Sequence, residues 1–303
     1  MSHESSTPAP SWSSGGLHQP NPHLEQDRAL LPALVAAVQE AGRTMVPLQL
    51  GRPDFETRDD VVAAIYANDD ASLAVLRPRL SALRPHAGWV DDELEGGVLP
   101  PGEWWVADPV EGNINHAHGL PDWGVTATLV RDNVPVVTAI HLPLTDETYS
   151  AVLGGGADVN GAPLVPSAKR ELVSALVGTG QAAPGESAEV FDRIGTSTTL
   201  MLHHAMVLRV SVPATLQLVQ VAAGRMDVFW QFSQVRSGLL AGALVVAESG
   251  GVVSDTRGLP WSLDSPDFLA TTPRLHQAAV EVLSTVAQVS PDQRELTHMR
   301  RTP

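Results

Sequence analysis

The sequence contains no cysteine among its 303 residues. This absence excludes a disulfide framework, a thiol nucleophile and a zinc–thiolate site. There is also no uninterrupted apolar run long enough to span a membrane. The N-terminus lacks the basic start and apolar centre of a secretion signal, so the cytoplasmic compartment is the expected location.

Basic residues are scarce relative to acidic ones. The chain has 19 Lys and Arg against 34 Asp and Glu, and its formal net charge is −15. This surplus of negative charge argues against a nucleic-acid backbone or an anionic membrane as the partner. A small molecule that carries a phosphate or sulfate ester is not excluded, because a bound metal ion or a helix N-terminus can reverse the local field.

The residues that are present fit a globular protein, with 43% hydrophobic and 17% charged residues. Residues 1–27 are rich in Ser, Pro, Gly and His without an apolar period, which predicts a disordered tail. Residues 28–166 combine helical periodicity with hairpins and predict an N-terminal α+β lobe. Strands and helices alternate over residues 167–288, which predicts a C-terminal α/β lobe. Residues 289–303 are expected to form a loose tail.

A helix is expected from near Asp27, and two more follow before the first long strand. The spacing of apolar residues predicts one helix over residues 59–67 and another from about residue 71 to residue 83. Asp69 and Asp70 lie at the junction between them. Capping of the second helix is a sufficient role for both residues.

One stretch, Trp104–Gly124, places polar side chains at the end of an apolar run that predicts a buried strand. It reads WWVADPVEGNINHAHGLPDWG. Asp108 and Glu111 flank Pro109 and Val110, so the two carboxylates and the Val110 carbonyl could share one hard cation. The alternative is an acidic turn whose side chains only cap backbone groups.

Four motifs in series resemble the inositol-monophosphatase-like enzymes. ADPVEGNINHAHGLPDWGVTATLV is similar to their D-P-[IL]-D-G-T-x-N-F segment and the run that follows it. TDETYSAVLGGGADVNGAPLVPS, LQLVQVAAGRMDVFW and GALVVAESGGVV are similar to three later motifs, in the family's order, over roughly residues 28–287. The resemblance implies a chain of the α+β and α/β classes folded as a layered αβαβα sandwich. It also implies a homodimer and magnesium-dependent phosphatase activity on a sugar, inositol or nucleotide.

The resemblance places the family's first metal site on residues of this chain. The first metal-ligand Glu falls on Asp92, with Glu93 beside it. The shared bridging Asp falls on Asp108, and Val110 supplies the carbonyl ligand. The family's upstream acid, which acts on the third metal and the attacking water, falls on Asp69. A shift of the alignment by one residue would place it on Asp70 instead.

Other family positions are altered in this chain. The Asp of the D-G-T turn becomes Glu111, and the Asp of the W-D-x-A-[AG] motif becomes Gly238, which has no ligating side chain. The Thr that orients the attacking water becomes Asn113. The substrate-holding G-[ST]-A triplet becomes Val212-Pro213-Ala214, and the acid that contacts a ring hydroxyl becomes Gln231.

These departures predict a retained scaffold with a rewritten site. A site that lacks one carboxylate should bind magnesium weakly. Crowded, partly desolvated carboxylates acquire raised pKa values, which suit a general acid or base. The leading hypothesis is therefore a cofactor-independent enzyme that acts on a phosphate- or sulfate-ester substrate. Its concrete form is intramolecular displacement of the ester to close a small ring, such as an aziridine, in a specialised biosynthetic pathway.

Two alternatives remain open. One is a magnesium-dependent phosphatase in which Mg²⁺ binding is partly retained, and the other is a non-catalytic binding pseudoenzyme. His116 is a candidate proton donor to a departing ester, with core packing as its alternative role.

The candidate catalytic residues are Asp69, Asp92, Glu93, Asp108, Glu111, Asn113 and His116. The candidate substrate-binding residues are Gly112, Asn113, Pro213, Gln231 and Gly238. The candidate metal ligands are Asp92, Asp108, Val110 and Glu111.

Overall fold

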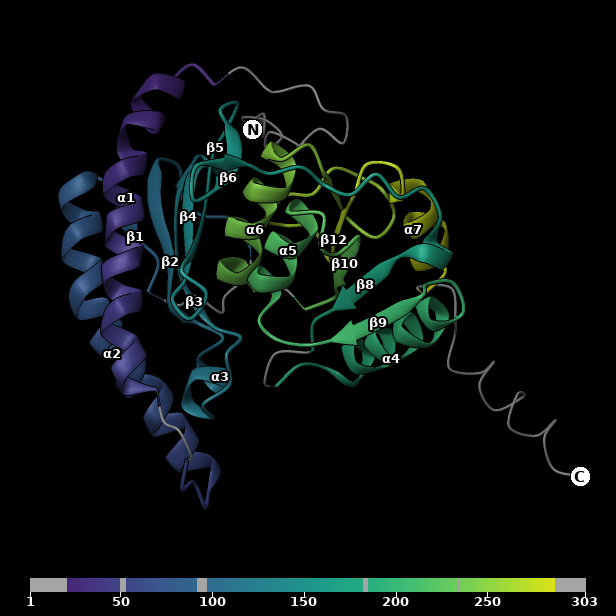
Figure 1. The fold of residues 1–303 in the computed structure, drawn as a ribbon, viewed down its shortest axis with the longest axis horizontal. Helices are drawn as coiled ribbons and strands as arrows, with labels where there is room; N and C mark the ends of the chain where they lie inside the picture. Colours follow the sequence, from purple (N-terminus) through teal and green to yellow (C-terminus); the bar gives the residue numbers. More distant parts are fainter. Residues whose placement is uncertain (1–20, 50–52, 92–96, 182–184, 234, 287–303) are drawn as a thin grey trace, which may run out of the picture.

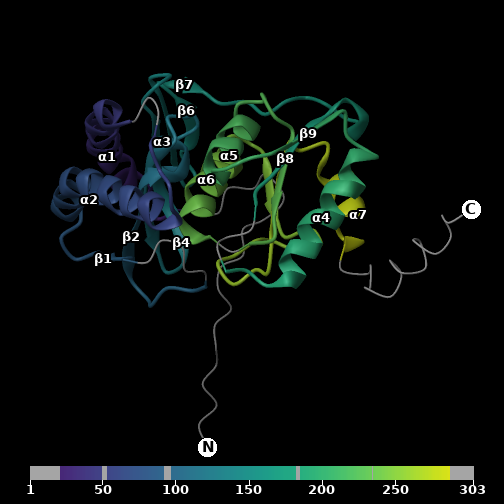
Figure 2. The same ribbon diagram turned by 90° about the horizontal axis from the view of Figure 1, so that it is seen from below.

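The computed structural model describes residues 21–49, 53–91, 97–181, 185–233 and 235–286. Helices and sheets alternate in five layers, which confirms the predicted αβαβα sandwich (Figure 1, Figure 2). The predicted lobe boundary, between residues 166 and 167, falls after the last strand of the first sheet. None of the helices within the described ranges is long and apolar enough to cross a membrane. The predicted tail at residues 289–303 lies outside the described residues.

The first sheet has seven strands, and helices α1 (Leu24–Met45) and α2 (Arg58–Leu83) cover its outer face. In sheet order the strands are β1 (Gly88–Trp89), β2 (Glu103–Glu111), β3 (Gly124–Arg131), β4 (Val134–Leu142), β5 (Glu147–Val152), β6 (Gly156–Val159) and β7 (Ala162–Pro163). All neighbours are antiparallel except β1 and β2. Trp105 and Ala107 pack under α1 and α2, whereas Val106 faces the middle helical layer. Burial on both faces explains the apolar run of β2.

The second sheet has five strands and shares the middle helical layer with the first. In sheet order the strands are β11 (Val252–Ser254), β12 (Phe268–Thr271), β10 (Val228–Gln231), β8 (Leu176–Thr179) and β9 (Val207–Val210). Helices α5 (Ala214–Ala222) and α6 (Arg236–Glu248) fill the middle layer, and α4 (Ala188–Leu202) and α7 (His276–Leu283) form the last one (Figure 1). The short elements are η1 (Val46–Leu48), α3 (Asn113–Ala117) and η2 (Leu172–Ser174). One apolar cluster joins α5 and α6 to both sheets, so the core continues across the predicted lobe boundary.

Helix α2 corrects one prediction. The sequence predicts two helices with Asp69 and Asp70 at their junction, but a single helix runs through both residues. The helix is capped at Thr57, whose hydroxyl accepts from the Asp60 amide while the Asp60 carboxylate accepts from the Thr57 amide. Asp69 therefore projects from the middle of a helix, where its carboxylate meets α3.

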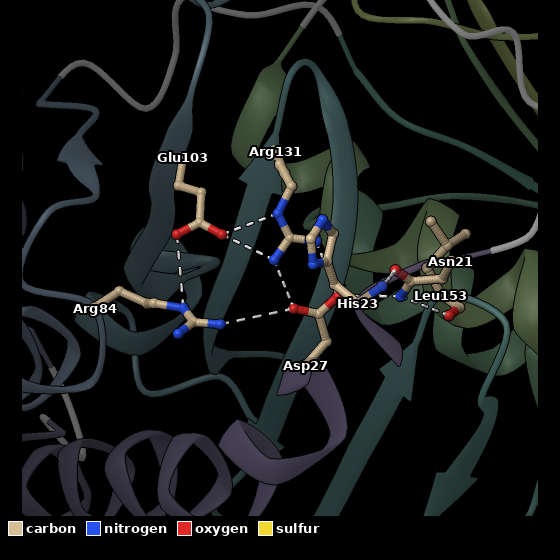
Figure 3. Close-up of polar contacts among 7 residues, drawn as sticks. All are labelled: Asn21, His23, Asp27, Arg84, Glu103, Arg131 and Leu153. Carbon is tan, nitrogen blue, oxygen red and sulfur yellow. Dashed lines mark hydrogen bonds and ion pairs between the residues drawn. The ribbon is translucent and has the colours of Figure 1, made fainter. Parts of the chain in front are cut away.

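An ionic cluster around the buried Asp27 ties the start of α1 to the first sheet (Figure 3). The Asp27 carboxylate is fully buried and accepts hydrogen bonds from both terminal nitrogens of Arg131, at 3.0 and 2.7 Å. Arg131 also binds Glu103, with N–O distances of 2.9 and 2.8 Å. Arg84 lies 3.6 Å from Glu103 and 3.9 Å from Asp27. Helix α1 begins at Leu24, so the last four residues of the predicted N-terminal tail are helical, whereas residues 1–20 lie outside the described residues.

Candidate active site

The two acids of the motif lie at the end of β2, where the register against β3 shifts between Asp108 and Glu111. Both residues are buried, with 8% and 4% of their surface exposed. The side chain of Asp108 forms a hydrogen bond with the Glu111 carboxyl group. Glu111 forms no ion pair with a basic residue in the described part of the chain. Two touching, buried carboxyl groups require a shared proton or a bound cation.

Thr215 on α5 and Gly238 on α6 complete the surroundings of Glu111. Thr215 Oγ1 lies 3.0 Å from Glu111 Oε2 and 2.8 Å from the Gly238 carbonyl oxygen. The Thr215 hydroxyl has one hydrogen, so it can donate to only one of these two oxygens at a time. A Cβ at Gly238 would lie 3.7 and 3.8 Å from the two Glu111 oxygens. A side chain at this position would therefore face Glu111, and glycine leaves that space open.

Burial shifts the pKa of two carboxyl groups upward. It raises the pKa of Glu111 to about 7, against the opposing hydrogen bonds of Thr215 and Asp108. It raises the pKa of Asp69 to about 6, against the opposing hydrogen bond of Asn113. Both groups can therefore exchange protons near neutral pH, as acid–base chemistry requires.

The turn that follows β2 is held tightly against the start of α5. Gly112 has φ +82°, and a Cβ there would lie 2.8 Å from the Asp122 carbonyl oxygen and 2.9 Å from Pro213 Cδ. Only glycine fits both the backbone angle and this close approach. Asn115 fastens the same turn, because its amide donates to the carbonyls of Asp122 and Val212 at 2.7 and 2.9 Å.

Helix α3 brings Asn113 to Asp69. Asn113 Nδ2 donates one hydrogen to Asp69 Oδ1 at 2.7 Å and the other to the Ile65 carbonyl at 2.9 Å. Both amide hydrogens are engaged, so Asn113 has none left to donate to a water molecule. Asp69 itself, rather than Asn113, is the group that can act on a water or a substrate.

His116 lies in the interior of the protein. Its ring is fully buried, with Nε2 3.0 Å from the Met45 carbonyl oxygen and Nδ1 3.0 Å from Asn68 Nδ2. The Trp123 ring packs against it edge to face, with 4.7 Å between the ring centroids. Burial also lowers the pKa of His116. This geometry favours packing, the role left open by the sequence, over proton donation to an ester.

The remaining candidate residues are Gln231, Asp92 and Glu93. Gln231 ends β10, and its Nε2 donates to the Ser233 carbonyl at 2.8 Å. Within the described ranges, no hydrogen bond joins Gln231 to Glu111. Asp92 and Glu93 lie outside the described residues.

The residues at the end of β2 offer oxygen atoms of the chemical kind that binds a hard cation. Asp108, Glu111 and the Val110 carbonyl supply the oxygen ligands that Mg²⁺ favours. A cation would also neutralise the buried carboxyl pair, and water or substrate oxygens could complete its coordination. Among the residues that the structure describes, no group of three or more Asp, Glu or His side chains is placed to hold a metal ion. The space at Gly238 supplies no further ligand.

The model of the Inositol monophosphatase family matches residues 60–288. The chain belongs to the inositol monophosphatase family. A probable inositol 1-monophosphatase, ImpA, of Mycobacterium tuberculosis is 32% identical over 270 residues, covering 88% of this chain and 96% of that protein. The inositol-1-monophosphatase of Rhizobium meliloti is 30% identical over 266 residues, covering 84% and 96%. The solved inositol monophosphatase from Anabaena (Nostoc) has a TM-score of 0.71 at 26% identity, covering 88% and 98%.

Two residues of this inositol monophosphatase-family site were not identified from the sequence. Thr215 contacts Glu111 from 104 positions away, and Asn68 contacts Asn113 from 45 positions away. The sequence contains a weak indication that Thr215 belongs to the site, because it directly follows the altered Val212-Pro213-Ala214 triplet. It contains none for Asn68, because an amide on a helix is ordinarily a solvated side chain.

Proposed function

We propose that the protein hydrolyses the phosphate monoester of a small molecule with the help of Mg²⁺. The observation that carries this proposal is the buried pair of carboxyl groups, Asp108 and Glu111, at the end of β2. A phosphate dianion would be repelled by these acids unless a cation lay between them. The relatives named as inositol monophosphatases support this reaction better than they support ring closure.

In this proposed reaction, each residue of the site has its own role. Asp108, Glu111 and the Val110 carbonyl would hold the cation, which when bound supplies positive charge for the phosphate oxygens. Asp69 takes a proton from the attacking water, since its pKa of about 6 suits a base near neutral pH. Asn113 holds Asp69 in place through the 2.7 Å hydrogen bond. Gly112 and Pro213, which pack against each other beside Glu111, are proposed to contact the substrate.

Ring closure is the second candidate, and Gly238 is the observation that favours it. The position that faces Glu111 carries no carboxylate, which weakens metal binding and leaves protonatable acids in the site. In this reaction a carboxylate removes a proton from an internal amine of the substrate. The nitrogen then forms a bond to carbon, the carbon–oxygen bond breaks, and phosphate or sulfate departs.

Product mass distinguishes the two reactions. The protein is incubated with a panel of phosphate and sulfate esters, with Mg²⁺ or with EDTA, in water enriched in oxygen-18. Hydrolysis is expected to need Mg²⁺ and to place the label in the products, and Asp108→Asn is expected to abolish it. Unlabelled cyclic product formed in EDTA would overturn hydrolysis in favour of ring closure. No turnover of any ester, with retained ligand binding, would favour a pseudoenzyme.

The edge of the second sheet supports the expected homodimer. In the described part of the chain, β9 pairs only with β8, so its outer edge is open. Met206, Val207 and Val210 lie on or beside this edge with 67%, 51% and 53% of their surface exposed. An open strand edge that carries apolar side chains favours association with another copy of the chain.

A further inference from the structure

Four side chains form a hydrogen-bonded series between two backbone carbonyls. The series runs from the Met45 carbonyl through His116, Asn68 and Asn113 to Asp69, with a branch to the Ile65 carbonyl. Its members lie on α2 and α3, which pack against each other beside the site (Figure 1). Successive N–O and N–N distances are 3.0, 3.0, 2.8 and 2.7 Å.

The two carbonyls fix the direction of every bond in this series. The Met45 carbonyl can only accept, so His116 carries its hydrogen on Nε2 and its Nδ1 accepts. Asn68 must then turn its NH₂ group toward Nδ1, and the second hydrogen of that group goes to Asn113 Oδ1.

The other end of the series gives the same orientation independently. The Ile65 carbonyl can only accept, so the atom of Asn113 that lies 2.9 Å from it is the nitrogen. A reversed Asn113 amide would place its oxygen against the Ile65 carbonyl and the Asp69 carboxylate. It would also place its NH₂ group against the NH₂ group of Asn68. Only one orientation of each amide is therefore compatible with the contacts.

We infer that Asn68 is a positioning residue for the base Asp69. It holds the Asn113 amide so that an N–H, and not the carbonyl oxygen, meets Asp69 Oδ1. Within the described residues no hydrogen bond engages Asp69 Oδ2, which is the oxygen left to receive a proton from water or substrate. The inference deepens the proposed function and rests on its assignment of Asp69 as the base. His116 acts through Asn68 as the anchor of the series.

A double-mutant cycle tests the role of Asn68 in turnover. Asn68→Ala is expected to lower kcat about tenfold with little change in KM, because one bond that orients the base is lost. Asn113→Thr replaces the amide by a hydroxyl that can rotate to donate to Asp69 without help. In that background Asn68→Ala is expected to change kcat by less than about twofold. An equal loss in both backgrounds would show a merely structural role and overturn the inference.

Ser72→Ala is the matched control for stability. Ser72 lies one helical turn after Asn68 on α2, is buried, and donates to the Pro109 carbonyl at 2.6 Å. This variant loses one buried hydrogen bond of the same helix without contacting Asn113. Its effect on kcat is expected to be the same in the wild-type background and in the Asn113→Thr background.

Nitrogen-15 NMR of the unmodified protein tests the bond directions without any substrate. With histidine labelled, His116 is expected to be neutral and to carry its hydrogen on Nε2 at pH 7. A hydrogen on Nδ1 would require Asn68 to present its oxygen and would overturn the inference. Because this measurement needs no turnover, a failure of the proposed hydrolysis would be recognised separately from a failure of the positioning role.

Discussion

At the scale of single residues, the protonation of Glu111 makes the stability of the metal-free protein depend on pH. Its pKa of about 7 lies above the usual 4.5, so the metal-free folded protein holds this proton more tightly than the unfolded chain does. The resulting stability is fully present below pH 4.5 and is lost as the pH rises through 7. In EDTA, the melting temperature is expected to fall across this interval. Glu111→Gln is expected to flatten the fall, as measured by scanning calorimetry.

Asp69→Asn is the companion variant for this measurement. The pKa of Asp69 rises only to about 6, so its removal should flatten the curve less and at lower pH. Each unit by which folding shifts a pKa changes the free energy of unfolding by about 1.4 kcal/mol, so the larger shift of Glu111 has the larger effect. Curves of equal slope for the wild type and Glu111→Gln would contradict a protonated Glu111.

Gly238 offers a test of cation binding. An added Cβ would make ordinary contacts of 3.7 and 3.8 Å with the Glu111 oxygens, so Gly238→Asp would place its carboxylate beside Glu111. It would add a third buried carboxylate, which lowers stability in EDTA and raises Mg²⁺ affinity on the order of tenfold. Titration calorimetry measures the affinity, and Gly238→Asn controls for volume. Equal Mg²⁺ affinity in the two variants would exclude a cation beside Glu111.

The sequence could identify residues whose place is set by their own backbone. Asp108 and Glu111 end a strand, and motif spacing placed Gly238 in the same site, where the structure finds it facing Glu111. It could not identify Asn68 or Thr215. Their roles come from side-chain contacts between distant segments, and no local pattern records such contacts.

At the scale of elements, the attachment of α1 depends on Asp27. Asp27→Ala leaves the partly buried Arg131 with Glu103 as its main partner, and the free energy of unfolding is expected to fall by about 3 kcal/mol. Urea unfolding measures this change. Glu25→Ala on the same helix removes only an exposed pair with Arg28, so a change within about 0.5 kcal/mol is expected. Similar losses in both variants would show that the cluster adds no stability.

Local signals predicted some elements and not others. The hairpins of the first sheet were predicted, and the one between β3 and β4 turns at Asp132 and Asn133, whose φ angles of 48° and 67° are left-handed. The continuity of α2 was not predicted. Asp69 and Asp70 are typical of a helix start, but contacts of α2 with α3 and β2 hold the helix together through them.

At the scale of the whole molecule, the open edge of β9 predicts how two copies meet. Val210→Glu is expected to shift a dimer toward monomer, because it places a charge among exposed apolar side chains. Analytical ultracentrifugation measures the change. Leu259→Glu is the control, since Leu259 has 58% of its surface exposed but lies outside β9. A dimer unaffected by Val210→Glu would place the interface elsewhere.

The layered architecture was predictable because four motifs in a fixed order identify the family and hence its layers. The alternation of strands and helices after residue 167 predicted the second sheet and its helices as a C-terminal lobe. Leu218 and Leu244, on α5 and α6, share a cluster with Ile140 of the first sheet and Phe229 of the second. Helices α5 and α6 thus pack against both sheets.

The contact between Trp123 and His116 gives the protein an internal optical probe. An indole ring whose neighbour is a neutral imidazole fluoresces more strongly than one whose neighbour is an imidazolium. The ring centroids are 4.7 Å apart, so the emission of Trp123 should report the protonation of His116. The difference in emission between the wild type and Trp123→Phe, followed during acidification, would show when the hydrogen-bonded series opens.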